Sequence, residues 1–200
     1  MSLADALRRR RSIRGLEGPP LSREEIEALV ELALLAPAPH HTRPWRFASI
    51  SLPRRAALAA AMGAAWEADM VRDGLDEAVR GRALERSRRR IEGAPTLLLG
   101  CLVGEGLNTY PDEQRTRAEW TMAAHSFGAA LQNLLLEASE RGLGAYWMAA
   151  PLYTPDEVRR VLELPGDWEP QAFIALGRRR ADYRPFDRPS PDLGGSLIER

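Results

Sequence analysis

The residues best suited to chemistry lie in a proline-rich stretch at residues 36–47, Ala-Pro-Ala-Pro-His-His-Thr-Arg-Pro-Trp-Arg-Phe. Its three prolines fix the backbone φ and remove hydrogen-bond donors, so we expect a stiff loop and no helix. A rigid backbone that carries several hydrogen-bonding side chains can hold a site ready for a flat polar ligand. The alternative is a plain connector between a helix and a strand. The side chains concerned are His40, His41, Thr42, Arg43 and Trp45.

A second candidate is the basic segment at residues 8–14, Arg-Arg-Arg-Arg-Ser-Ile-Arg. Consecutive arginines on a helix point all round it, so some of them must be solvated, and their charge is favourable at a helix C-terminus. The functional alternative is an anion-binding cradle. In that arrangement Ser12 and Arg14, alternate residues of an extended exit from the helix, join Arg10.

Three further segments carry open alternatives. The polar loop at residues 104–117 contains Tyr110 and Arg115, and it is either a ligand-binding loop or a surface lid without function. Gly-Leu-Gly at 142–144 either ends a helix or lets the backbone approach a flat ring closely. The arginines at positions 86, 88, 89 and 90 form either a solvated helix face or a site for an acidic ligand.

Composition narrows the classes of protein. The 200 residues, 44% of them hydrophobic, suit a single domain (1–200) with a real core. The 28 basic and 28 acidic residues balance, which indicates neither disorder nor a nucleic-acid-binding chain. All the basic residues are arginine, whose planar guanidinium binds phosphates and carboxylates through two hydrogen bonds, as lysine cannot. With one cysteine, Cys101, in an apolar run, and no secretory or membrane-spanning pattern, we expect a cytoplasmic protein with a buried thiol.

Hydrophobic periodicity predicts about four strands alternating with six helices. Two capping boxes begin helices after positions 2 and 22. Strands are expected at 47–52, 96–103, 145–150 and 171–177, the second buried on both faces. Helices are expected over 54–93, with a break near 73–74, and over 118–141, in the middle of the fold.

The C-terminal part of the chain adds a short helix and a tail. Thr154, Pro155 and Glu157 form an N-cap, an N1 proline and a capping box. Residues 178–200 are rich in arginine, proline and glycine and cannot make a core of their own, so they hang free or wrap a partner.

Several common sites are absent from the sequence. No glycine-rich dinucleotide fingerprint or Walker sequence follows a strand. His40, His41 and His125 lack cysteine or acidic partners at metal-ligand spacing, so no metal site is expected. No nucleophile elbow is visible.

Four motifs resemble the FMN-dependent nitroreductase family: Arg-Arg-Ser-Ile-Arg at 10–14, the stretch at 36–47, Gln-Asn-Leu at 132–134 and Gly-Leu-Gly at 142–144. Most members of that family have Ser, Asn and Gln where this chain has Ala38, His41 and Arg43. At these positions the chain resembles a narrower group, the C-terminal flavin domain of the actinobacterial coenzyme F-420 ligase. The ligase half is absent from these residues, so ligase activity is not expected.

The resemblance implies an α+β fold with a central mixed sheet flanked by helices, and an intertwined homodimer with FMN at the subunit interface. It implies that the basic segment and a tail arginine hold the phosphate. The stretch at 36–47 then reaches the ring from the other subunit, the Gly-Leu-Gly motif lies against the ring, and the tail packs on the partner. The implied FMN-binding residues are Arg10, Arg11, Ser12, Arg14, Pro37, Ala38, Pro39, His41, Leu143, Gly144 and Arg188.

The narrower group implies that the small-molecule substrate is the deazaflavin coenzyme F-420 or its dehydro precursor, whose enolpyruvyl double bond would be reduced. Its phosphodiester and carboxylates would meet His40, Arg43, Tyr110 and Arg115, with His40 the candidate proton donor because imidazole titrates near neutrality. Two alternatives remain: a generic NAD(P)H-dependent nitro or quinone reductase, and a non-catalytic deazaflavin-binding module. No nucleic acid or membrane partner is expected.

Overall fold

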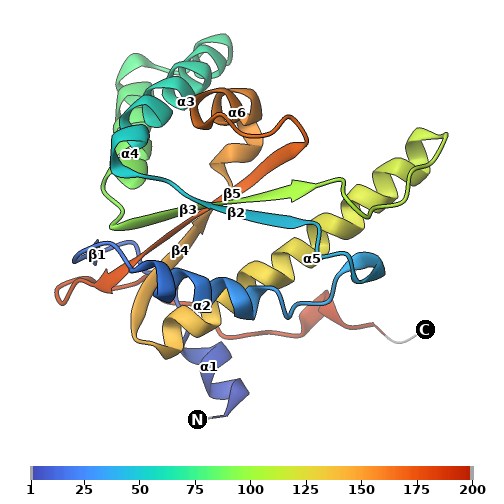
Figure 1. The fold of residues 1–200 in the computed structure, drawn as a ribbon. Helices are drawn as coiled ribbons and strands as arrows, with labels where there is room; N and C mark the ends of the chain where they lie inside the picture. Colours follow the sequence, from blue (N-terminus) through green and yellow to red (C-terminus); the bar gives the residue numbers. More distant parts are fainter. Residues whose placement is uncertain (1, 199–200) are drawn as a thin grey trace.

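An antiparallel five-stranded sheet forms the centre of the computed structural model, which describes residues 2–198 (Figure 1). The strand order is β1-β5-β3-β2, and β4 also pairs with β5. All the pairings among these strands are antiparallel. The strands are β1 (Leu16–Glu17), β2 (Trp45–Ser49), β3 (Thr96–Val103), β4 (Leu143–Met148) and β5 (Trp168–Arg179).

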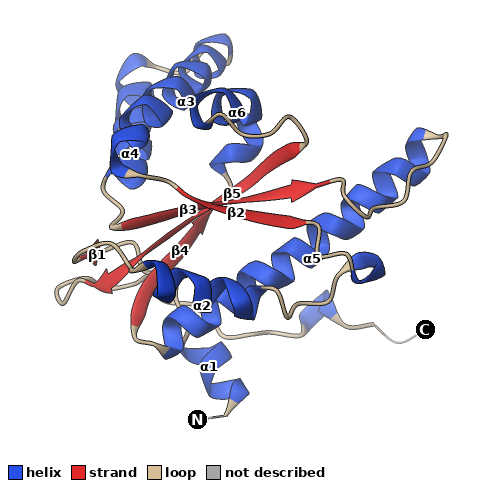
Figure 2. Cartoon of the chain, viewed as in Figure 1, coloured by secondary structure: helices blue, strands red, loops and turns tan. Residues whose placement is uncertain are grey.

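Helices cover both faces of this sheet (Figure 2). On one face lie α2 (Arg23–Ala33) and the long α5 (Glu113–Glu140), with α1 (Leu3–Arg9) beside α5. On the other face lie α3 (Leu52–Arg72), α4 (Glu77–Glu92) and α6 (Pro155–Leu162). The predicted α+β arrangement, a central sheet flanked by helices, is confirmed.

Strand β3 joins the two halves of the core. All eight of its residues are buried, as the apolar run predicted. Leu97, Leu99 and Cys101 pack into the core on the α3 side, while Leu98 and Leu102 pack into the core on the α5 side, because successive side chains alternate across a strand. Burial raises the pKa of the Cys101 thiol to about 12, so it is an inert core residue.

Local sequence signals located most helix ends. Both capping boxes are present, since the Ser2 and Ser22 hydroxyls each accept a hydrogen bond from the backbone N–H three residues on. The predicted break near residues 73–74 separates α3 from α4. Helix α5 begins at Glu113, earlier than predicted, because the Asp112 carboxylate accepts a hydrogen bond from the Arg115 N–H at 2.8 Å.

Two local features differ from the prediction. Residues 16 and 17, which lie outside the predicted strands, form β1 against the end of β5. The capping box at Thr154 is absent, and the Thr154 side chain caps nothing. Its backbone is held instead by a short 3-10 turn, Ala150–Tyr153, because the Thr154 N–H donates to the Pro151 carbonyl oxygen at 3.3 Å.

The tail has two parts. Its first part lies on its own chain, where the Arg180 N–H donates to the Gly15 carbonyl oxygen at 3.0 Å and the Tyr183 ring packs directly against Gly15. Arg188 then bonds to the end of α1. Residues 189–198 are exposed throughout. The prediction that the tail packs on a partner subunit therefore concerns this exposed second part.

Candidate functional site

Two arginines from opposite ends of the sequence meet at the C-terminal end of α1. The Arg188 guanidinium donates hydrogen bonds to the carbonyl oxygens of Leu7, at 3.1 Å, and of Arg10. Burial, and secondly the positive charge of Arg188, lower the pKa of the half-buried Arg10 guanidinium. Neither side chain pairs with a carboxylate anywhere in residues 2–198. Adjacent uncompensated guanidinium groups favour an anion such as a phosphate.

The segment that leaves α1 lies along β4. The Ile13 N–H donates to the Ala145 carbonyl oxygen at 2.9 Å, and the Ile13 side chain is buried. Ser12 and Arg14 therefore face the other way, as the alternation predicted. The Arg14 guanidinium lies 5.8 Å from the centre of the Tyr146 ring. Arg11 turns back, and its Nη1 donates to the carbonyl oxygens of Arg8 and Arg10 at 2.5 and 3.1 Å.

A cavity of about 420 Å³ opens between α3, α4 and the C-terminal end of β4. One end is basic, with Arg14, Arg86 and Arg90, and Met62 and Met148 contribute apolar surface. Such a cavity, mostly apolar with a few directed polar groups, suits a flat ring. We call it the ring cavity. Tyr146 also lines it, and burial raises the pKa of this phenol.

The space over the second glycine of the Gly-Leu-Gly motif is filled within this chain. A Cβ at Gly144 would come within 2.6 Å of Leu16 Cδ2 and 3.0 Å of Ile13 Cγ2, so the segment after α1 already fills the space over this glycine. The two glycines serve the structural alternative instead: Gly142 (φ +74°) ends α5, and Gly144 permits close packing. Leu143 lines a separate cavity of about 190 Å³ that also includes Arg11.

Sequence reasoning missed the residues that form the ring cavity. Tyr146 and Met148 lie at alternate positions of β4, on the side that faces α3. Arg90 was predicted to belong either to a solvated helix face or to a site for an acidic ligand, and not to a flavin site. The hydrogen bond between Ile13 and Ala145 brings Arg14 beside Tyr146, and no local pattern in the sequence contains that pairing.

The stretch at residues 36–47 is held in a strained conformation. His40, His41 and Arg43 have φ of 51°, 58° and 50°, in the left-handed region that non-glycine residues rarely adopt. His40 Nε2 lies 2.7 Å from Glu119 Oε1, and the Asn108 N–H donates to the same oxygen at 3.0 Å. Glu119 is 5% exposed, and the hydrogen bond from Asn108, followed by that from His40, lowers the pKa of its carboxyl.

This loop lies far from α4 in the molecule (Figure 1). Pro37, Ala38, Pro39 and His41 do not line the ring cavity of their own chain, so their role at a flavin stays a prediction that requires another subunit. Arg43 is exposed and makes no ion pair within residues 2–198. It lines a surface cavity of about 310 Å³ together with His41.

The other predicted substrate residues are engaged within the fold. Arg115 pairs with Asp112, and its guanidinium lies 4.9 Å from the centre of the Tyr110 ring. These residues stabilise the start of α5 and do not line the ring cavity. His40 is likewise bound to Glu119 at its Nε2. A direct substrate role for His40, Tyr110 and Arg115 stays a prediction that requires a second subunit.

No group of three or more histidine, cysteine, aspartate or glutamate side chains in the described part of the chain could hold a metal ion. No helix among residues 2–198 is long and apolar enough to cross a membrane.

Two neighbouring arginines without carboxylate partners in residues 2–198, a cavity that suits a flat ring and a sheet flanked by helices are the features expected of a flavin-binding protein. The chain belongs to the nitroreductase family, whose model matches residues 7–178. It is similar to the 5,6-dimethylbenzimidazole synthase of Rhodospirillum rubrum, with 26% identity over 92% of this chain and 82% of the relative. It is also similar to a Bacillus subtilis protein named as an NAD(P)H nitroreductase, with 28% identity over 88% of this chain and 83% of the relative.

Solved structures agree. A nitroreductase in complex with FMN from Desulfovibrio desulfuricans superimposes with a TM-score of 0.73 and 25% identity over 100% of this chain and 97% of that one. A BluB-like flavoprotein from Clostridium difficile 630 superimposes with a TM-score of 0.80 and 22% identity, over 100% of this chain and 99% of that one. The protein is an FMN-dependent oxidoreductase of this family.

The residues present fit FMN. Arg10 and Arg188 would hold the dianionic phosphate, with Ser12 beside them, and the ring would enter the cavity next to Arg14 and Tyr146. FMN supplies hydride transfer when it is bound. The chain itself would contribute positive charge at the phosphate and an apolar wall beside the ring.

Proposed function

We propose that this oxidoreductase acts on an anionic deazaflavin, binding coenzyme F-420 or reducing its dehydro precursor, in a homodimer whose loop at 36–47 serves the neighbouring subunit's flavin. The observation that carries the proposal is the state of Arg43. A structural role for this residue would pair its guanidinium with a carboxylate to stiffen the loop. It has no such partner in residues 2–198, and it sits on a backbone that holds it in a single strained conformation.

The test replaces Arg43 by glutamine. Arg43→Gln should weaken deazaflavin binding about thirtyfold, or about 2 kcal/mol, because an amide cannot replace a bidentate guanidinium contact to phosphate or carboxylate. FMN retention and reduction of a small neutral nitroaromatic should change little. Fluorescence titration with the deazaflavin, beside nitroaromatic kinetics, compares the two ligands. Equal losses for both would reject the proposal.

A second candidate function is a generic NAD(P)H-dependent nitro or quinone reductase, which the similarity to the relative named as an NAD(P)H nitroreductase favours. Such an enzyme needs only a permissive pocket. Rapid bleaching of the bound flavin by NADPH, with no competition from the deazaflavin, would favour this candidate. Tight deazaflavin binding without turnover by any reductant would indicate a binding module instead.

A further inference from the structure

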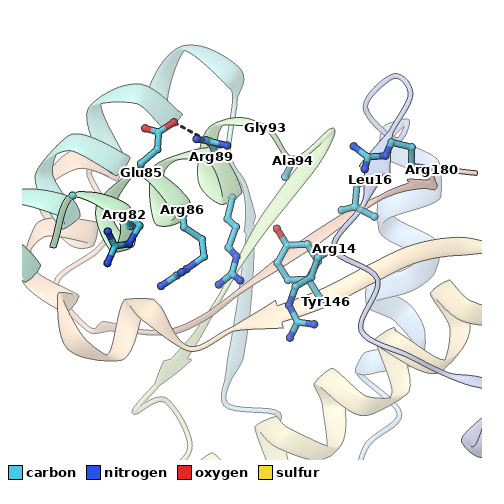
Figure 3. Close-up of a pocket in the computed structure, with 12 residues that line it drawn as sticks. Arg14, Leu16, Arg82, Glu85, Arg86, Arg89, Gly93, Ala94, Tyr146 and Arg180 are labelled. Carbon is cyan, nitrogen blue, oxygen red and sulfur yellow. Dashed lines mark hydrogen bonds and ion pairs between the residues drawn. The ribbon is translucent and has the colours of Figure 1, made fainter. Parts of the chain in front are cut away.

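A second basic cavity adjoins the ring cavity. It has a volume of about 780 Å³ and shares Arg14, Arg86, Arg90 and Tyr146 with the ring cavity (Figure 3). Arg82 lines only this second cavity. Arg82, Arg86 and Arg90 are spaced four residues apart along α4, so they occupy one face of the helix. We call these three residues the α4 arginine row.

The carboxylate that lines this cavity already pairs with two other arginines of α4. Glu85 accepts hydrogen bonds from Arg88 Nε at 2.9 Å and Arg89 Nε at 2.6 Å, and Figure 3 shows the pair with Arg89 above Arg82 and Arg86. These bonds lower the pKa of Glu85 to about 2. Arg180, on the far wall, pairs with Asp182 at 2.6 Å.

The α4 arginine row, by contrast, makes no ion pair and no side-chain hydrogen bond within the described residues. Like charges four residues apart on a helix repel each other, so this arrangement destabilises α4 unless an anion lies beside it. The neighbouring arginines of the same helix show that carboxylate partners were available, because Arg88 pairs with both Glu85 and Glu92.

The spacing indicates the kind of anion. Residues four apart rise about 6 Å along a helix, so the row spans about 12 Å. A single phosphate could contact only part of that length. A flexible chain with several negative groups could contact all of it, with one end beside the ring cavity.

We propose that the α4 arginine row, together with Arg14, binds a multiply anionic tail of the substrate, a chain that carries phosphate or carboxylate groups. This inference rests on the proposed function, because a deazaflavin with a phosphodiester and carboxylates carries such a tail. It deepens that function by locating the tail along α4, while the substrate's ring faces the flavin.

The first experiment does not depend on the identity of the substrate. FMN-loaded protein is titrated calorimetrically with tripolyphosphate. The double variant Arg82→Gln/Arg86→Gln should bind it about tenfold more weakly, since each exposed guanidinium–phosphate pair contributes about three- to fivefold. The matched control is Arg72→Gln/Arg88→Gln, which removes the same charge from arginines that already pair with carboxylates. It should lose less than about twofold. No binding by the wild type, or equal loss in both variants, would overturn the inference.

The second experiment separates this inference from the proposed function. The wild type and both double variants are titrated with coenzyme F-420 and with a deazaflavin that lacks the phosphate and its tail. The Arg82→Gln/Arg86→Gln variant should lose affinity only for the tailed ligand. If the wild type binds tripolyphosphate through these arginines but binds neither deazaflavin, the proposed substrate is wrong and the anion site stands. If it binds both deazaflavins and the variant loses neither, the inference is wrong and the proposed function stands.

Discussion

At the scale of single residues, charge without a partner marks the site. Most arginines for which an ion pair is found pair with a carboxylate a few residues away on the same helix, and such exposed pairs contribute little to stability. Arg10, Arg188 and Arg43 do not pair in this way. An unpaired guanidinium that is partly buried or held on strained backbone is therefore the informative feature of this chain.

Arg10→Ala and Arg188→Ala should each weaken FMN retention about 10- to 150-fold, because a charge-assisted hydrogen bond contributes about 1.5–3 kcal/mol. The dissociation constant for FMN is read from flavin fluorescence during dialysis. Arg8→Ala is the control, since Arg8 lies on the same helix, is exposed and faces Asp5 at 3.9 Å. FMN affinity that stays unchanged in both variants would remove the phosphate site from this position.

Thr154 offers a test of a different kind. Its hydroxyl is buried at the wall of the ring cavity and has no hydrogen-bond partner among residues 2–198. A buried hydroxyl without a partner costs about 1–3 kcal/mol, so Thr154→Val, which keeps the shape, should leave the melting temperature unchanged or raise it. A large fall in melting temperature for the FMN-free protein would show that the hydroxyl has a partner. Weaker substrate binding at unchanged stability would identify that partner as the substrate.

At the scale of elements, buried Glu119 on α5 fixes the loop at residues 36–47. Its carboxyl has a pKa below the ordinary value for glutamate, so the stability that it contributes is present above about pH 4 and is lost as the pH falls through the lowered pKa. Glu119→Gln should lower the melting temperature at pH 7. The difference from the wild type should then shrink below about pH 4.

The control for this experiment is Glu113→Gln, on the first turn of the same helix, where the carboxylate is exposed and pairs only with Arg117. It should show almost no difference at either pH. A Glu119→Gln difference that is the same at pH 7 and pH 3 would mean that the carboxylate charge does not hold the loop.

The elements themselves were predictable because their signals are local. Serine caps, the break at 73–74 and the apolar run of β3 each act over a few residues, and the structure has all three. Strand β1 was missed because two residues cannot show a period. The approach of Arg14 to Tyr146 in the ring cavity could not be predicted for a similar reason: it depends on Ile13 lying beside Ala145, a contact between residues 132 positions apart, which no window of sequence contains.

At the scale of the whole molecule, the distance between the loop at 36–47 and the ring cavity predicts a homodimer, since the loop can serve a flavin only in another subunit. Helix α5 offers a surface for it. Ala124 and His125 are exposed there, and a side chain at Gly128 would meet nothing within 4 Å. The exposed tail residues Leu193 and Leu197 add apolar surface that a partner could cover.

Gly128→Arg should therefore leave the subunit folded and prevent dimerisation. Arginine is a better helix former than glycine by about 1 kcal/mol, so far-ultraviolet circular dichroism should be unchanged. Sedimentation at micromolar concentration should show a monomer with reduced FMN content. Ala60→Arg, at an exposed position of α3 across the sheet, should remain a flavin-loaded dimer. A wild-type monomer that retains FMN would contradict the dimeric site.

The strain in the loop at residues 36–47 sets a limit on how stable this enzyme can become. Each left-handed non-glycine residue costs about 1–3 kcal/mol, and the loop holds three of them where glycine would cost less. His40 is held in place by its hydrogen bond to buried Glu119, but no such bond holds His41 or Arg43 within residues 2–198. A search guided by thermostability alone would therefore select glycine at positions 41 and 43 and would discard the imidazole and the guanidinium there. Under the proposed function, activity and heat resistance compete at these two positions.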